Sequence, residues 1–107
     1  MFVINGETWD VLLVPPNDIS LLMPNGNYAI GACVGSENMI YINWEMRGAE
    51  FEQVLCHEMV HAAMFAYNII LERDDEEMLA EIIAAFGEEI IDLTDLLFDE
   101  IKKGRLI

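Results

Sequence analysis

The sequence predicts an α+β domain in which a small, mostly antiparallel sheet packs against two long helices. Short apolar runs, rich in β-branched and aromatic residues and separated by turn signals, occupy residues 1–43, and such runs are typical of strands. Two long segments with helical spacing of apolar residues follow them. Strands followed by helices, rather than alternating with them, favour the α+β class.

The expected strands all lie in the N-terminal half of the chain. Asn5-Gly6 is a tight-turn signal between the first two strands. Pro15-Pro16 ends the second strand, and one helical turn capped by Asp18 is expected between residues 17 and 23. Residues 35–38 are the expected connection of a hairpin. The predicted strands are residues 2–4, 8–14, 28–34 and 39–43.

The two expected helices span residues 49–67 and about 74–103. Apolar residues wrap around much of the first helix, which predicts burial on most of its sides. For the second helix, Asp74 or Asp75 is the expected cap, with acidic residues in the first turn and basic residues in the last. Gly87 is a position where this helix can bend.

The charge of the chain is strongly acidic. It has 5 Lys and Arg against 20 Asp and Glu, a formal net charge of -15. Such a surface repels nucleic-acid phosphates and anionic membranes, so we expect neither as a partner. No apolar run approaches the length of a membrane span, and the first residues lack the features of a signal peptide. We therefore expect one cytoplasmic domain over residues 1–107.

The strongest functional signal is His57-Glu58-Met59-Val60-His61. Residues four apart lie on one face of a helix, so both imidazoles can reach one metal ion. Zinc accepts histidine nitrogens as ligands. Glu58 lies beside such an ion rather than on it, where it can act as a general base toward the attacking water. No other histidine exists in the chain, so chance placement is a weak alternative. Cys56 points about 100° away from His57 on the helix, so we do not expect it to be a ligand.

A third protein ligand is expected to be a carboxylate from the second helix, because catalytic zinc sites usually have three. Glu81 stands among Ala80, Ala84 and Ala85, and small residues let two helices approach closely. Glu81 is therefore the predicted ligand. Glu77, one helical turn earlier, is the alternative.

These residues resemble the gluzincin, or thermolysin-like, zinc metallopeptidases over roughly residues 39–86. In that family the third ligand, a glutamate, lies about twenty residues beyond the second histidine, as Glu81 does here. The compact size and the order of strands before two helices are closest to the minimal zincin-like proteins of phages and prophages. The resemblance implies a zinc-dependent hydrolase that acts on a peptide or protein substrate.

The resemblance also implies features that this chain must supply differently. Residues 39–42 look like the edge strand that holds an extended peptide in such enzymes. An aspartate four residues after the glutamate ligand supports a histidine in the family, and for Glu81 that position is Ala85. The family's additional histidine, which stabilises the oxyanion, is absent. The possible substitutes are Tyr28, Tyr41, Tyr67 and Arg47.

Two other functions compete with a peptidase. One is a non-catalytic zinc-binding domain that serves as a protein-interaction module, and the other is a structural phage or host protein without metal. The presence of Glu58 favours the enzyme, since a purely structural zinc site needs no base. The wide apolar surface of the last helix, from Met78 to Ile101, predicts contact with another chain, expected to be a homodimer.

Overall fold

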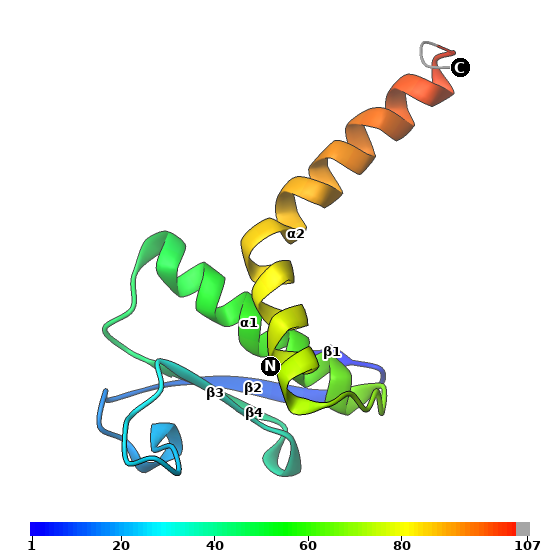
Figure 1. Ribbon diagram of the computed structural model, residues 1–107. Helices are drawn as coiled ribbons and strands as arrows, with labels where there is room; N and C mark the ends of the chain where they lie inside the picture. Colours follow the sequence, from blue (N-terminus) through cyan, green and yellow to red (C-terminus); the bar gives the residue numbers. More distant parts are fainter. Residues whose placement is uncertain (105–107) are drawn as a thin grey trace.

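The four-stranded sheet and two helices of the structure, a computed structural model that describes residues 1–104, confirm the α+β class (Figure 1). The last three residues of the expected domain lie outside the described residues. The elements in chain order are β1 (Phe2–Ile4), β2 (Glu7–Val14), the 3-10 turn η1 (Ile19–Leu21), β3 (Gly31–Val34), the 3-10 turn η2 (Gly35–Glu37), β4 (Met39–Asn43), α1 (Gly48–Ala66) and α2 (Arg73–Lys102).

The sheet has the strand order β1-β2-β4-β3. The β1–β2 and β3–β4 pairs are antiparallel, and β2 pairs with β4 in parallel, from Asp10 opposite Met39 to Val14 opposite Asn43. The sheet is thus mixed, with two of its three pairs antiparallel. The expectation that residues 39–42 form the edge strand is wrong, because this strand is internal and β3 forms the edge. The sequence of the β3–β4 hairpin does not reveal which of its two strands will pair with β2.

The turn between β1 and β2 also holds the end of α1. Asn5 and Gly6 both have positive φ angles, 48° and 79°, as the two central residues of a type I′ turn require. In this position the Asn5 side-chain nitrogen donates a hydrogen bond to the Ala66 carbonyl oxygen at 2.9 Å. The turn therefore supplies a partner for one of the last carbonyls of α1, which have none within the helix.

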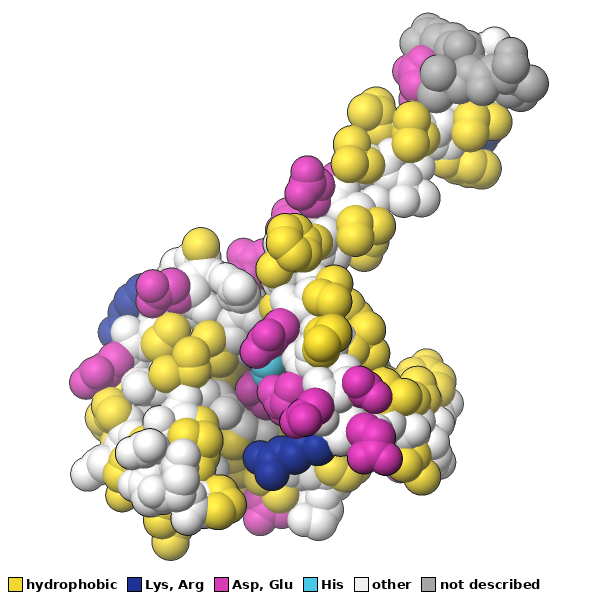
Figure 2. Space-filling model, in the orientation of Figure 1, with side chains coloured by type: hydrophobic (Ala, Val, Ile, Leu, Met, Phe, Trp, Pro, Cys, Tyr) yellow, Lys and Arg dark blue, Asp and Glu magenta, His cyan; other side chains and the backbone are white. Residues whose placement is uncertain are grey.

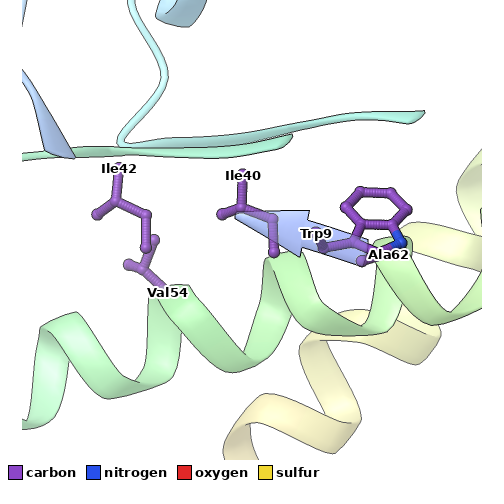
Figure 3. Packing of buried hydrophobic residues seen from close by; sticks show 5 residues of the cluster. All are labelled: Trp9, Ile40, Ile42, Val54 and Ala62. Carbon is purple, nitrogen blue, oxygen red and sulfur yellow. The ribbon is translucent and has the colours of Figure 1, made fainter. Parts of the chain in front are cut away.

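The core lies between the sheet and α1 (Figure 3). Ile40 and Ile42 of β4 are fully buried and project toward α1, since alternate residues of a strand face the same side. They meet Val54 and Ala62 of the helix, and Trp9 of β2 lies beside Ala62. This packing fixes the rotation of α1 about its axis.

The helix boundaries agree with the expected ones to within two residues. Asp18 caps η1, as expected, because its side chain accepts a hydrogen bond from the Ser20 backbone nitrogen at 3.0 Å. The expected cap of α2 is wrong: the helix begins at Arg73, its N-cap is Glu72, and no side chain caps it. Acidic residues do occupy its first turn, and Lys102 lies in its last turn.

The two halves of α2 have different surroundings. The first half packs against α1, and the second half projects away from the rest of the molecule (Figure 1). The principal extents are accordingly 55 × 30 × 28 Å. No helix among residues 1–104 has the length and apolar character that crossing a membrane requires.

Candidate metal centre

The motif residues lie on two adjacent faces of α1, one toward the sheet and one toward α2. Val54, Glu58 and Ala62 are spaced by four residues, so they share the face that packs on the sheet. His57 and His61 form the adjacent stripe and meet the first turns of α2. The contact of α1 with the sheet thus determines both the burial of Glu58 and the direction of the two imidazoles.

The structure brings His57 and His61 together with Glu77. The His57 Nε2 atom lies 3.2 Å from one carboxylate oxygen of Glu77, and the His61 Nε2 atom lies 3.0 Å from the other. One potential ligand atom from each of the three residues lies within 4.8 Å of the others. Figure 2 shows acidic side chains gathered around the exposed part of a histidine.

A second carboxylate orients His61 from the other side of its ring. Glu76 Oε2 lies 2.6 Å from His61 Nδ1, while the Nε2 atom of the same ring faces Glu77. With Glu76 accepting, the Nδ1 atom carries the proton, and the Nε2 lone pair is left for another partner. This is the arrangement in which a carboxylate fixes the ring of a metal-binding histidine.

Glu77, not Glu81, is the α2 carboxylate that lies with the two histidines. Ala80 is fully buried and marks the close approach of the two helices. Glu76 and Glu77 precede Ala80 by four and three residues, so both flank this contact, whereas Glu81 is rotated about 100° from it. The sequence placed the contact among Ala80, Ala84 and Ala85, with Glu81 at its centre. Of these three alanines only Ala80 is fully buried, so the contact is centred at Ala80 and not at Glu81.

Glu58 is buried beside the cluster. Its residue is only 8 % exposed, and burial is the main reason that its pKa is raised above the ordinary glutamate value. The positive charge that His57 and His61 can carry opposes this shift in pKa, and the negative charge of Glu77 adds to it. The structure thus places a base candidate next to the two histidines and outside the group of potential ligands.

Edge strand β3 packs directly over Glu58 at Gly31. A Cβ atom at this glycine would lie 2.8 Å from the Val54 Cγ1 atom and 3.2 Å from both Cγ and Oε2 of Glu58. The absence of a side chain therefore lets the strand approach the helix at the position of the base.

We expect Gly31→Ala to reduce the free energy of unfolding by about 1–3 kcal/mol through overpacking. Denaturant unfolding measures the effect. The crowded atom belongs to Val54, so Gly31→Ala should cost less in a Val54→Ala background, with a coupling of about 0.5 kcal/mol or more. Additive effects of the two substitutions would contradict this close contact.

An open pocket of about 790 Å³ adjoins the cluster on the side of His57. Ile30, Met46 and Val54 give it apolar walls, and Glu50 and Glu81 add carboxylates. Glu81, the ligand predicted from the sequence, thus lines this pocket and is not in the group with His57, His61 and Glu77. The pocket suits a side chain with an aliphatic stem and a positive end.

The expected oxyanion-stabilising residues are not among those that line this pocket. Tyr41 lies on the face of β4 opposite Ile40 and Ile42, and its hydroxyl donates to Glu37 at 2.7 Å. Arg47 donates to the backbone oxygens of Trp44 and Met46, just before α1. Tyr28 and Tyr67 are about half exposed.

Cys33 lies near the site but does not resemble a ligand. Burial, followed by the nearby charges of Glu58 and Glu76, raises the pKa of its thiol to about 12. Zinc binds the thiolate form of cysteine, so this environment disfavours binding through sulfur. Cys33 and Cys56 are both free.

Two features of the site escaped the sequence. Glu76 contacts His61, but in the sequence it is one of several acids in the first turn of α2. Its contact with His61 could be recognised only if the rotation of α2 relative to α1 were known. Gly31 carries no signal of its own, since its φ angle is not in the left-handed region. Its role comes entirely from the close approach of β3 to α1.

Comparison with known proteins identifies no relative: no family model, no curated protein and no solved structure matches this chain.

Proposed function

We propose that this protein is a zinc-dependent peptidase in which His57, His61 and Glu77 hold the ion and Glu58 is the general base. The observation that carries the proposal is the convergence of two histidine Nε2 atoms on one carboxylate, at 3.2 and 3.0 Å, beside a buried glutamate. The resemblance of the motif to gluzincins supports the same assignment.

The donor set fits zinc in kind and in spacing. Two imidazole nitrogens and one carboxylate are a common ligand set of catalytic zinc, which leaves one position open. Ligand atoms around a tetrahedral zinc lie roughly 3.3 Å apart, given bonds of about 2.0–2.1 Å. The His57 and His61 Nε2 atoms lie 3.2 and 3.0 Å from the two different oxygens of Glu77, and one potential ligand atom from each of the three residues lies within 4.8 Å of the others.

The local charge also favours a divalent cation. Glu58, Glu76 and Glu77 approach the two histidines, and the whole chain has a formal net charge of -15. A bound cation relieves the mutual repulsion of these carboxylates. Glu76 supports the site by fixing the ring of His61.

With Glu77 as the ligand, the family's spacing of about twenty residues is lost, since Glu77 lies 16 residues beyond His61, but another feature of the family gains a counterpart. In thermolysin-like enzymes an acid four residues beyond the glutamate ligand supports a histidine. With Glu77 as the ligand, that position is Glu81, which lines the same pocket as His57. Because of this position we propose Glu81 as the supporting acid of His57. Its side chain is one methylene longer than that of the family's aspartate.

Zinc, when bound, supplies a Lewis acid that lowers the pKa of water to about 7. Glu58 contributes the base that accepts a proton from the attacking water and donates it to the leaving amine. The burial that raises its pKa makes it a stronger base than an exposed glutamate. Gly31 leaves room for the carboxylate beneath β3.

The proposed substrate is an extended, basic peptide. Strand β3 is an edge of the sheet and packs on α1, so its outer side offers backbone groups to which a peptide can add as another strand. The pocket beside His57 would receive one side chain. Its carboxylates Glu50 and Glu81 favour lysine or arginine there.

The first test is metal content. Protein purified without chelators or nickel is expected to contain one zinc per chain by mass spectrometry. The zinc affinity should fall as the pH is lowered, because protons compete with the metal for imidazole nitrogen. Metal-free protein that takes up no zinc at neutral pH would overturn the proposal and leave the His–Glu contacts as ordinary ion pairs.

The second candidate is a zinc-stabilised interaction module without turnover. The exposed apolar half of α2 favours it, as does the lack of an expected oxyanion donor in the pocket. Zinc binding without hydrolysis of any basic peptide would favour this candidate over the peptidase.

A further inference from the structure

The second half of α2 with its C-cap Lys103, residues 88–103, has an apolar surface that no other element among residues 1–104 covers (Figures 1 and 2). We call this segment the arm. Its apolar side chains are about half exposed, including Ile90, Leu93, Leu96, Leu97, Phe98 and Ile101. A contiguous exposed surface of this kind is unusual on a monomer.

The shape of the chain reflects this arm. Its radius of gyration is 16.6 Å, whereas a compact chain of this length has a value of about 13 Å. An isolated helical segment of about fifteen residues is only marginally stable in water. The arm therefore needs packing from another surface to remain helical.

The spacing of the apolar residues fits a helical partner. Ile90, Leu93 and Leu97 are separated by three and then four residues, the spacing at which apolar residues of one helix line up against a second helix. The opposite side carries Glu88, Asp92, Asp95 and Asp99, again at separations of four and three. This side is expected to remain in water.

The charge distribution along the arm identifies the partner and its direction. Acids occupy the start of the arm, at Glu88 and Glu89, whereas the lysines of the arm, Lys102 and Lys103, lie at its end, after Asp99 and Glu100. A parallel pair of arms would place acids beside acids and lysines beside lysines. An antiparallel pair places each acidic start beside the basic end of the other copy.

We infer that two copies of this protein associate through an antiparallel pair of arms. Glu89 of one copy lies next to Lys103 of the second copy, and Leu93 and Leu97 of both copies pack across the midpoint. In one chain Lys103 contacts Asp99 at 2.8 Å. Both groups of this pair are about half exposed, so exchange for a contact between copies costs little.

The test is the concentration dependence of molecular mass, measured by light scattering and sedimentation on the full chain. The wild-type protein is expected to be a dimer. Leu97→Glu places a charge in the seam and should weaken association by more than about 10-fold. Circular dichroism and zinc uptake should show that the sheet and α1 remain folded.

Charge reversal tests the direction. Glu89→Lys and Lys103→Glu should each weaken association, and the double variant should restore it, because an antiparallel pair then has the same contacts with exchanged signs. Asp95→Lys is the matched control on the water-facing side and should have little effect. A wild-type monomer at high concentration would overturn the dimer. Failure of the double variant to restore association would overturn the antiparallel arrangement.

Discussion

Glu77→Ala is expected to weaken zinc binding by more than about 100-fold, beyond the 10–100-fold loss typical of residues that only orient a ligand. The carboxylate of Glu77 contacts the Nε2 atoms of both His57 and His61, so its removal leaves two histidines and water. Competition titration with a chromophoric chelator measures the affinity. The melting temperature in the presence of zinc should fall as well, because metal binding stabilises the folded state.

Three matched variants on the same helix make this test specific. Glu76→Gln and Glu81→Gln change acids proposed to orient a histidine, so each should weaken zinc binding by about 10–100-fold. Glu88→Gln lies beyond the contact with α1 and should leave the affinity unchanged. A larger loss from Glu81→Ala than from Glu77→Ala would restore Glu81 as the ligand. It would also mean that α2 is rotated relative to the packing around Ala80.

Glu58→Gln is expected to retain zinc and to lower peptidase activity by about 100-fold or more. Glutamine has nearly the same shape as glutamate but cannot accept the proton from water. Cleavage of unstructured peptides that contain lysine or arginine, followed by mass spectrometry, measures the activity. Matched peptides with glutamate at the same positions should be cleaved more slowly, because Glu50 and Glu81 line the pocket.

Stability provides the folding control for this variant. Burial raises the pKa of Glu58, so its ionised form opposes folding at neutral pH, above the ordinary glutamate pKa. Metal-free Glu58→Gln should therefore be at least as stable as the metal-free wild type at pH 7. Loss of zinc from a folded Glu58→Gln variant would instead make Glu58 a ligand. Retained activity would exclude it as the base.

The local elements could be predicted because their signals are local. Asn5-Gly6 specifies a tight turn, Asp18 caps η1, and the apolar spacing of residues 49–67 indicates α1. The motif likewise depends on the period of one helix, which alone places His57 and His61 on one face. Neither prediction required knowledge of how distant segments meet.

Tertiary contacts decided which strand forms the edge of the sheet and which glutamate of α2 lies beside the histidines. β4 became internal because it pairs in parallel with β2, and this pairing joins strands that are far apart in the chain. Glu77 rather than Glu81 meets the histidines because Ala80 is the point of close approach between α1 and α2. Glu77 and Glu81 lie on nearly the same face of α2, one turn or about 6 Å apart along its axis, so the position of the contact along the helix decides between them.

The sequence by itself thus determined the class of fold, the helix that carries His57 and His61, and the position of Glu58 one residue beyond the first histidine. Tertiary structure decided that Glu58 is buried under Gly31, that Glu76 and Glu77 face the histidines, and that β3 borders the site. The physical reason is that helical and strand periods set which residues share a face. Only the packing of one face against another sets which faces meet.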